Sequence, residues 1–108
     1  MHGGTSPPRH GFLEIVYKDA LEREFSAAGI AYGREVRFDI DYKGRILPHP
    51  IYAEFTVFHK IILEVKCTPG LPDVLYAQTL NYLKVSGNRL GLLVTFGQPS
   101  LEFRRVVL

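Results

Sequence analysis

The sequence predicts a mixed α/β (α+β) domain, in which a mixed β-sheet is flanked by helices. Two long segments have the apolar periodicity of helices, and each ends at a glycine. Between and after them lie short apolar or alternating segments, separated by turns that contain Gly or Pro, as is typical of strands. A chain of 108 residues has room for one compact domain and too few residues for two.

Composition excludes several classes of protein. Hydrophobic residues make up 46% of the chain, which argues against disorder. The single cysteine, Cys67, excludes an intrachain disulfide and fits a reducing compartment. A formal net charge of +2 permits nucleic-acid binding without demanding it. Because no apolar run approaches the roughly 20 residues of a membrane helix, we expect no membrane partner and a cytoplasmic location.

The N-terminal part is predicted to be a leader followed by a helix. Residues 1–10 are rich in Gly, Ser and Pro and lack the apolar centre of a signal peptide, so we expect a flexible leader before a single domain at 11–108. Residues 12–29 have helical periodicity and end at Gly29. Glu14 falls on the apolar stripe of this helix. It is either a functional acid or a carboxylate that caps free amides near the helix start.

The next segment is predicted to be a strand and a turn. Residues 35–47 alternate apolar and polar side chains, as in a half-buried strand. Lys43-Gly44 then predicts a turn into a short return, which Pro48 and Pro50 confine to a sheet edge.

Residues 51–57 and 61–67 are predicted to form a hairpin with a three-residue turn. In that register Glu54 lies opposite Glu64, with Cβ atoms roughly 4.5–5.5 Å apart. The second strand is apolar on both faces, which predicts a central place in the sheet. Two buried carboxylates repel each other unless a proton or a cation lies between them. Lys66 shares the face of Glu64, so this hairpin is either a functional site or a charged sheet rim.

A second helix follows at 73–86. Asp73 is its expected N-cap, and Gly87 is its expected end. The helix is apolar on two sides, which predicts contact with its own sheet and with another layer or subunit. Gln78 and Tyr82 lie four residues apart and are therefore neighbours on its surface.

The last part of the chain is predicted to add two strands. Residues 89–96 are almost continuously apolar, as in a buried strand. Residues 101–108 are expected to form an edge strand, on which Arg104 and Arg105 discourage further pairing.

Several motifs resemble a known family. The stretch GFLEIVY resembles the signature of the GxxExxY family, which belongs to the PD-(D/E)xK nuclease-like superfamily. The resemblance continues through YKG at 42–44, EVK at 64–66, the helix AQTLNYLK, and the tail from RLGLLVTFG to LEFRRVVL. It covers nearly the whole chain from residue 11 and implies a restriction-endonuclease-like core.

The resemblance also implies a site. The catalytic residues that it implies are Glu54, Glu64 and Lys66. The implied ligands of Mg²⁺ or Mn²⁺ are Glu14, Glu54, Glu64 and the backbone carbonyl of Val65. The expected substrate-binding residues are Gln78 and Tyr82, together with the basic residues Arg34 and Lys43.

The sequence departs from the family in two places. Glu54 stands where the family has aspartate, and a glutamate reaches one methylene further, whereas Mg²⁺ demands near-ideal octahedral geometry. Relatives also carry a helix before GFLEIVY, and its absence exposes apolar surface.

Three hypotheses of function follow. The first is a metal-dependent nuclease that hydrolyses phosphodiester bonds of DNA or RNA. The second, which the Glu54 departure favours, is a catalytically inactive module that binds nucleic acid or a protein partner. The third is a homo-oligomerisation unit that uses helix 73–86 or the apolar edge left by the missing N-terminal helix.

Overall fold

The computed structural model describes residues 9–97 and 99–108, and it confirms a mixed sheet with two helices. The helices are α1 (Arg9–Ala27) and α2 (Asp73–Ser86). The strands are β1 (Tyr32–Phe38), β2 (Asp41–Tyr42), β3 (Arg45–Ile46), β4 (Ile51–Val57), β5 (Ile61–Lys66), β6 (Leu90–Thr95) and β7 (Glu102–Val107). Five strands form the main sheet in the order β1-β4-β5-β6-β7, and only β5 and β6 are parallel. The predicted central place of β5 is therefore confirmed.

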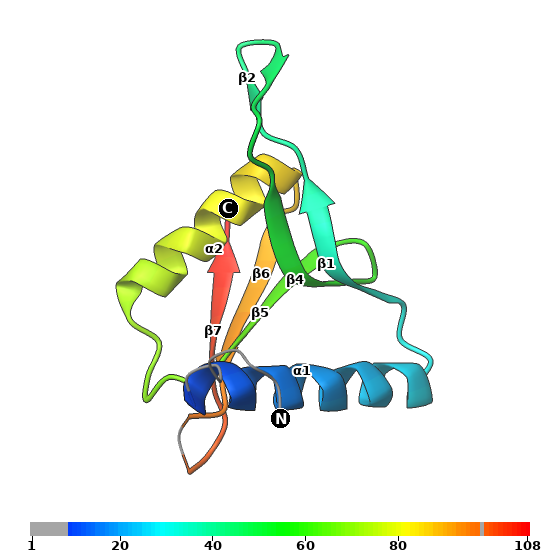
Figure 1. The fold of residues 1–108 in the computed structure, drawn as a ribbon, viewed down its shortest axis with the longest axis vertical. Coiled ribbons are helices and arrows are strands. Elements are labelled where there is room, and N and C mark those ends of the chain that lie inside the picture. Colours follow the sequence, from blue (N-terminus) through cyan, green and yellow to red (C-terminus); the bar gives the residue numbers. More distant parts are fainter. Residues whose placement is uncertain (1–8, 98) are drawn as a thin grey trace, which may run out of the picture.

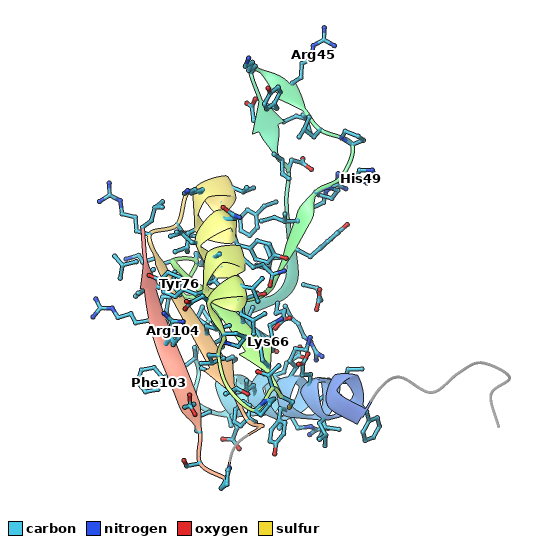
Figure 2. All side chains as sticks on the ribbon, turned by 90° about the vertical axis from the view of Figure 1, so that its left-hand side faces the viewer. Arg45, His49, Lys66, Tyr76, Phe103 and Arg104 are labelled. Atoms are coloured by element: carbon cyan, nitrogen blue, oxygen red, sulfur yellow. The ribbon has the colours of Figure 1, made fainter. Side chains whose placement is uncertain are left out.

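The two helices cover the sheet from different sides (Figure 1). One apolar cluster joins the sheet to α2 and includes Ile62, Leu83 and Leu93. The other joins it to α1 and is centred on Phe55 and Val65. The predicted edge strand β7 is at the edge, and Arg104 anchors it to α2 because its guanidinium carbon lies 4.4 Å from the Tyr76 ring centroid (Figure 2).

Strand β4 turns over at Glu54. Residues two apart on a flat strand share a face. Ala53 and Phe55 are both fully buried, yet Ala53 packs in the α2-side cluster and Phe55 in the α1-side cluster. The neighbouring strand β1 is distorted at the same level, since Glu35 has a φ of 53°, in the left-handed region that residues other than glycine rarely adopt. Glu54 therefore lies at the point where its strand changes sides.

The strand predicted from residue 35 to the turn at Lys43-Gly44 is interrupted after Phe38. β1 begins earlier, at Tyr32, and ends at Phe38, and β2 and β3 form a separate two-stranded sheet. This hairpin projects from the body of the molecule (Figure 1). The predicted turn at Lys43-Gly44 is confirmed, with φ values of 52° and 84°.

Three expectations about the helix ends need correction. α1 begins at Arg9, inside the predicted leader, while residues 1–8 lie outside the described residues. Glu14 is therefore beyond the first turn and does not cap α1. The N-cap of α2 is Pro72, and Asp73 instead pairs with Arg104 at 3.1 Å. The predicted helix ends are confirmed, since Gly29 and Gly87 have φ values of 70° and 78°.

The first half of α1 leaves apolar side chains uncovered. Phe12, Ile15 and Val16 are 56%, 47% and 45% exposed. They lie three and four residues apart, so they form one stripe along the helix. Across residues 9–97 and 99–108, neither helix has the length and apolarity that a membrane crossing needs.

Candidate active site

Glu54 and Glu64 lie side by side on neighbouring strands, as predicted, but their contact differs from an ordinary strand pair. The regular pairing of β4 with β5 stops at Phe55 and Leu63, one residue before the two acids. Beyond that point each carboxylate binds the opposite backbone. The Glu54 N–H donates to Glu64 Oε2 at 2.8 Å, and the Val65 N–H donates to Glu54 Oε1 at 2.7 Å. Side chains thus replace backbone carbonyls where β4 turns over.

Glu64 is the more deeply buried of the two acids, with 2% of its surface exposed. Burial, together with the negative charge of Glu54, raises the pKa of Glu64 to about 8. The buried position disfavours the ionised form of Glu64, and acids with a raised pKa of this kind are typical of functional sites.

Two lysines face Glu54. Lys66 Nζ lies 3.2 Å from Glu54 Oε2, and Lys18 Nζ of α1 lies 3.9 Å from the same oxygen. Both lysine side chains are largely buried, with 16% and 12% of their surface exposed. Burial lowers the pKa of Lys66, but the charges of Glu54 and Glu64 outweigh it and the pKa is raised. Lys66 therefore remains cationic beside the acids.

Glu14 joins the same region from α1. Its Oε2 accepts a hydrogen bond of 3.0 Å from the N–H of Cys67, the residue that follows Lys66. Cys67 is buried, and burial together with the charge of Glu14 raises the pKa of its thiol, which disfavours the reactive thiolate. Glu14 thus ties α1 to the end of β5.

The two predicted substrate-binding residues of α2 differ in their exposure. Tyr82 is half-buried and packs against the α2-side cluster. Burial, followed by the charge of Glu64, raises the pKa of the Tyr82 hydroxyl. Gln78 is exposed one turn away on the same helix.

The two predicted basic contacts lie in different settings. Arg34 bonds to Asp19 at 2.6 Å and to Glu22 at 2.8 Å, and these ion pairs hold β1 against α1. Two carboxylates already neutralise its guanidinium. Lys43 is exposed at the tip of the β2–β3 hairpin, away from the acids.

Comparison with known proteins bears on the family and the fold of the chain. A family model described as the PD-(D/E)XK nuclease superfamily matches residues 9–106. The chain belongs to the PD-(D/E)XK nuclease superfamily. The match is to the superfamily, and the closer resemblance to the GxxExxY family stays a prediction. None of the curated proteins matches the chain.

Among solved structures, this superfamily member is similar to one titled "Crystal structure of SSO0001". The two have a TM-score of 0.71 and 20% sequence identity, which shows a shared fold. The similarity covers 90% of this chain and 50% of that one, so the chain spans half the length of that structure.

Nucleases of the PD-(D/E)XK superfamily generally use divalent metals, and the donor set here fits Mg²⁺ only in part. Within residues 9–97 and 99–108, no three His, Cys, Asp or Glu side chains are grouped to hold an ion. The predicted three-acid ligand set is therefore not assembled, because Glu14 binds the Cys67 amide. Mg²⁺ keeps several waters and needs only one or two carboxylates. Glu54 and Glu64 supply two, and one of them is a buried acid whose charge a cation would stabilise.

Lys18 is part of the site but is not among the residues predicted from the sequence, although its spacing of four residues from Glu14 indicates that the two lie on one face of the helix. Lys18 Nζ lies 3.9 Å from both Glu54 and Glu35, and it bridges the two distorted strands. The distortion at Glu35 could not be seen in the sequence, since nothing marks a glutamate for the left-handed region.

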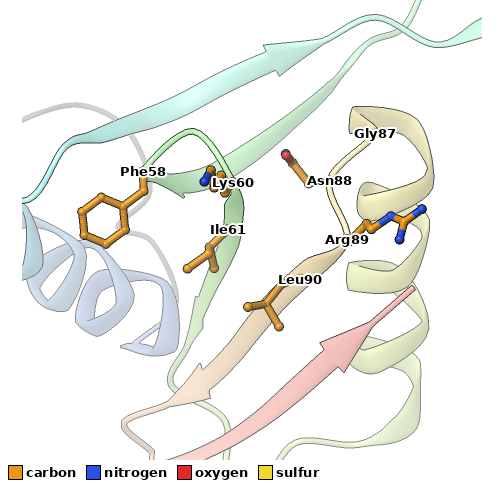
Figure 3. A pocket seen from close by; sticks show the side chains of 7 residues that line it. All are labelled: Phe58, Lys60, Ile61, Gly87, Asn88, Arg89 and Leu90. Atoms are coloured by element: carbon orange, nitrogen blue, oxygen red, sulfur yellow. The ribbon is translucent and has the colours of Figure 1, made fainter.

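A pocket lies at the end of β5 opposite the acid pair. It has a volume of about 440 Å³ and is lined by residues 58–61 and 87–90, mostly with apolar surface (Figure 3). It begins at Ile61, whereas the acid pair lies toward Lys66, so this pocket is not part of the candidate site.

The raised pKa of Glu64 predicts an unusual dependence of stability on pH in this superfamily member. The folded-state pKa of Glu64 is about 8, above its ordinary value of 4.5, so between these values the folded chain holds a proton that the unfolded chain has released. The stability that this group contributes is therefore fully present below the lower value and is lost as pH rises toward about 8. Urea unfolding in a metal chelator, from about pH 5 to about pH 9, measures this fall.

Glu64→Gln is the matched variant for this prediction. The amide keeps the shape of the side chain and an oxygen for the Glu54 N–H, but it has no proton to lose. We expect its urea midpoint to change less with pH and to exceed that of the wild type above about pH 8. Equal slopes for the two proteins would contradict the prediction.

Proposed function

We propose that the chain is a metal-dependent nuclease domain that hydrolyses phosphodiester bonds of nucleic acid. The observation that carries the proposal is the cluster of Glu54, Glu64 and Lys66. The acid Glu64 is 2% exposed, and the ammonium of Lys66 lies 3.2 Å from Glu54. A buried acid with a raised pKa, beside a second acid and a lysine, is an arrangement suited to binding a cation next to an anionic substrate.

The chemistry follows from the charges. A bound Mg²⁺ or Mn²⁺ neutralises the phosphate and lowers the pKa of a coordinated water. Glu54 and Glu64, with the backbone carbonyl of Val65, would hold the ion. Lys66 would orient the attacking water and stabilise the negative charge that develops on the phosphate. The Tyr82 hydroxyl would donate to a phosphate oxygen and set the substrate register, with Gln78 beside it on α2.

A second candidate function is a catalytically inactive module that keeps the fold and binds a nucleic acid or protein partner. One observation favours it. The carboxylates already accept hydrogen bonds from two backbone N–H groups, and the Lys66 ammonium sits on Glu54. The longer glutamate at position 54 allows this closed arrangement, because it reaches across to the Val65 amide. An aspartate would be one methylene shorter.

Metal titration separates the two functions. We expect saturating Mn²⁺ to raise the melting temperature of the wild type by about 5 °C or more, since an ion that binds only the folded state stabilises it. Glu64→Ala should lose this gain, whereas Glu102→Ala, an exposed acid on the edge strand β7, should keep it. Cleavage of plasmid, single-stranded DNA and RNA is measured in parallel.

The outcome for Glu54→Asp decides between catalyst and inactive module. If the nuclease proposal holds, the wild type cleaves at least one substrate with Mg²⁺ or Mn²⁺. If the wild type is inert and Glu54→Asp is active, the chain is an inactivated relative. Calorimetry that detects no heat of binding with either ion removes the enzymatic proposal. Self-association through helix 73–86 or the exposed stripe of α1 stays a prediction, which the mass in solution tests.

A further inference from the structure

Three glutamates from neighbouring strands lie in one row across the sheet. The pairing of β1 with β4 skips one position, and its register on both sides of that position places Glu35 opposite Glu54. The register of β4 with β5, continued by one residue, places Glu54 opposite Glu64. The candidate acid pair therefore has a third carboxylate beside it on β1, one that no sequence motif indicated.

The ammonium of Lys18 lies between two of these acids. Its Nζ is 3.9 Å from Glu35 Oε1 and 3.9 Å from Glu54 Oε2. Both distances are longer than those of a charge-assisted hydrogen bond, which are about 2.7–2.9 Å. The Lys18 side chain is largely buried, because α1 holds it against the sheet. The ammonium is therefore shared between two carboxylates, and a small movement commits it to either one.

The two acids differ in their other partners. Arg34, the cation next to Glu35 in the chain, is taken by two acids of α1. Within residues 9–97 and 99–108, Lys18 is the one cation at ion-pair distance from Glu35. Glu54 has a second cation, since Lys66 Nζ lies 3.2 Å from it. Glu54 therefore remains paired when Lys18 moves toward Glu35, whereas the reverse movement leaves Glu35 without an ion pair.

The position of Glu35 depends on an unfavourable backbone. Its φ of 53° is in the left-handed region, which favours glycine and, among other residues, asparagine and aspartate. Backbone of this kind persists where the surrounding structure imposes it, and it is concentrated at functional sites. The Glu35 side chain is 56% exposed, so burial of apolar surface does not explain the strain. What the distorted strand provides is a carboxylate beside Lys18.

We propose that Lys18 and Glu35 are positioning residues for Glu54 and form a latch on the candidate site. In the absence of a divalent cation, Lys18 is shared with Glu54 and competes for its Oε2. On binding of a cation to Glu54, Lys18 moves onto Glu35. Because Glu54 holds an ion only under the proposed function, the latch rests on that function. Glu35 touches neither ion nor substrate and acts through Lys18.

Calorimetric Mn²⁺ titration of Lys18 variants is the first test. Lys18→Gln removes the competing charge and should bind Mn²⁺ about tenfold more tightly than the wild type. Lys18→Arg keeps the charge, and its planar fork reaches carboxylates well, so its affinity should not exceed that of the wild type. Lys60→Gln makes the first change at an exposed lysine in the turn before β5, and its affinity should stay within about twofold of the wild type.

The Glu35 variants should shift the affinity in the opposite direction. Glu35→Gln removes the alternative partner, so Lys18 stays on Glu54, and Mn²⁺ binding should weaken about fivefold. In the Lys18→Gln protein the same change should weaken binding less than about twofold, because Glu35 acts through Lys18. Purely structural roles would weaken binding in both single variants and would not give opposite signs.

Glu35→Gly separates the latch from damage to the fold. Glycine adopts a φ of 53° without steric cost, so this variant should melt at a higher temperature than Glu35→Gln in a metal chelator. It lacks the carboxylate and should bind Mn²⁺ as weakly as Glu35→Gln does. Higher stability combined with weaker metal binding is the result that a supporting role in the fold would not produce.

Three results overturn the latch. The first is Mn²⁺ binding by Lys18→Gln that is no tighter than in the wild type. The second is an equal effect of Glu35→Gln with and without Lys18, which assigns Glu35 a direct electrostatic role. The third is no binding by either the wild type or Lys18→Gln, which also removes the enzymatic proposal.

Cleavage, measured on the same samples, distinguishes the latch from the nuclease proposal. If the affinities shift as expected and no substrate is cleaved, the latch stands and the nuclease proposal fails. If all variants bind Mn²⁺ equally and the wild type cleaves, the nuclease proposal stands and the latch fails. Binding by Lys18→Gln alone supports the latch and identifies the wild type as closed to the ion.

Discussion

Lys66→Ala is expected to lower the rate of nucleic-acid cleavage by about 10²-fold or more while leaving metal binding intact. The loss is large because the ammonium lies where charge develops on the phosphate, in a site that is largely closed to water. Metal binding is expected to persist or tighten. Lys66 Nζ, 3.2 Å from Glu54, competes with an ion for that carboxylate, and its removal leaves two acids with less compensation.

The readouts are single-turnover cleavage and calorimetric Mn²⁺ titration of the same samples. Lys60→Ala, an exposed lysine in the turn just before β5, is the control for loss of one positive charge. Lys18→Ala tests the second ammonium, which lies 3.9 Å from Glu54. If Lys66→Ala cleaves at the wild-type rate, Lys66 has no catalytic role. If it loses metal binding along with cleavage, its role is structural.

Gly97→Ala is expected to produce the largest loss of stability, about 3 kcal/mol or more in the free energy of unfolding. A Cβ at Gly97 would lie 2.2 Å from the carbonyl oxygen of Thr68 and 2.6 Å from that of Cys67. Both are backbone atoms, so no side-chain rotation relieves the overlap. The segment after β6 packs directly on the end of β5, where the Phe96 N–H donates to the Lys66 carbonyl at 2.9 Å.

The clash also bears on the site, because relief of the overlap must move the residues that follow Lys66. Thermal unfolding should show a decrease in melting temperature of more than about 10 °C. Gly70→Ala is the matched control, because a Cβ at Gly70 meets nothing within 4 Å. A Gly97→Ala protein as stable as Gly70→Ala would show that these segments are not in close contact.

The sequence determined the elements because their signals are local. Apolar periodicity located both helices, and glycine marked where each one ends, since left-handed backbone favours glycine. Continuous apolarity on both faces placed β5 at the centre of the sheet. The hairpin register followed from the turn, so the proximity of Glu54 to Glu64 was predictable.

The tertiary structure alone decided how these acids are used. Strand β4 changes sides at Glu54, so that Ala53 and Phe55 lie in different apolar clusters, each of which packs against one of the two helices. Where the strand changes sides, its regular pairing with β5 stops, and the two carboxylates bind the backbone of the opposite strand. The fold also brings Lys18 to Glu54 across 36 residues of chain.

Packing between distant segments also decides the position of the β2–β3 hairpin and the contact that Glu14 makes. Alternation predicts one strand from residue 35 to the turn at Lys43-Gly44, but β1 ends at Phe38 and the next residues form a separate, projecting hairpin. Position on a helix suggested two roles for Glu14, whereas the fold brings it to the Cys67 amide. Local sequence sets backbone preference and periodicity, but contacts between distant segments depend on how the layers pack, and no short stretch of chain encodes them.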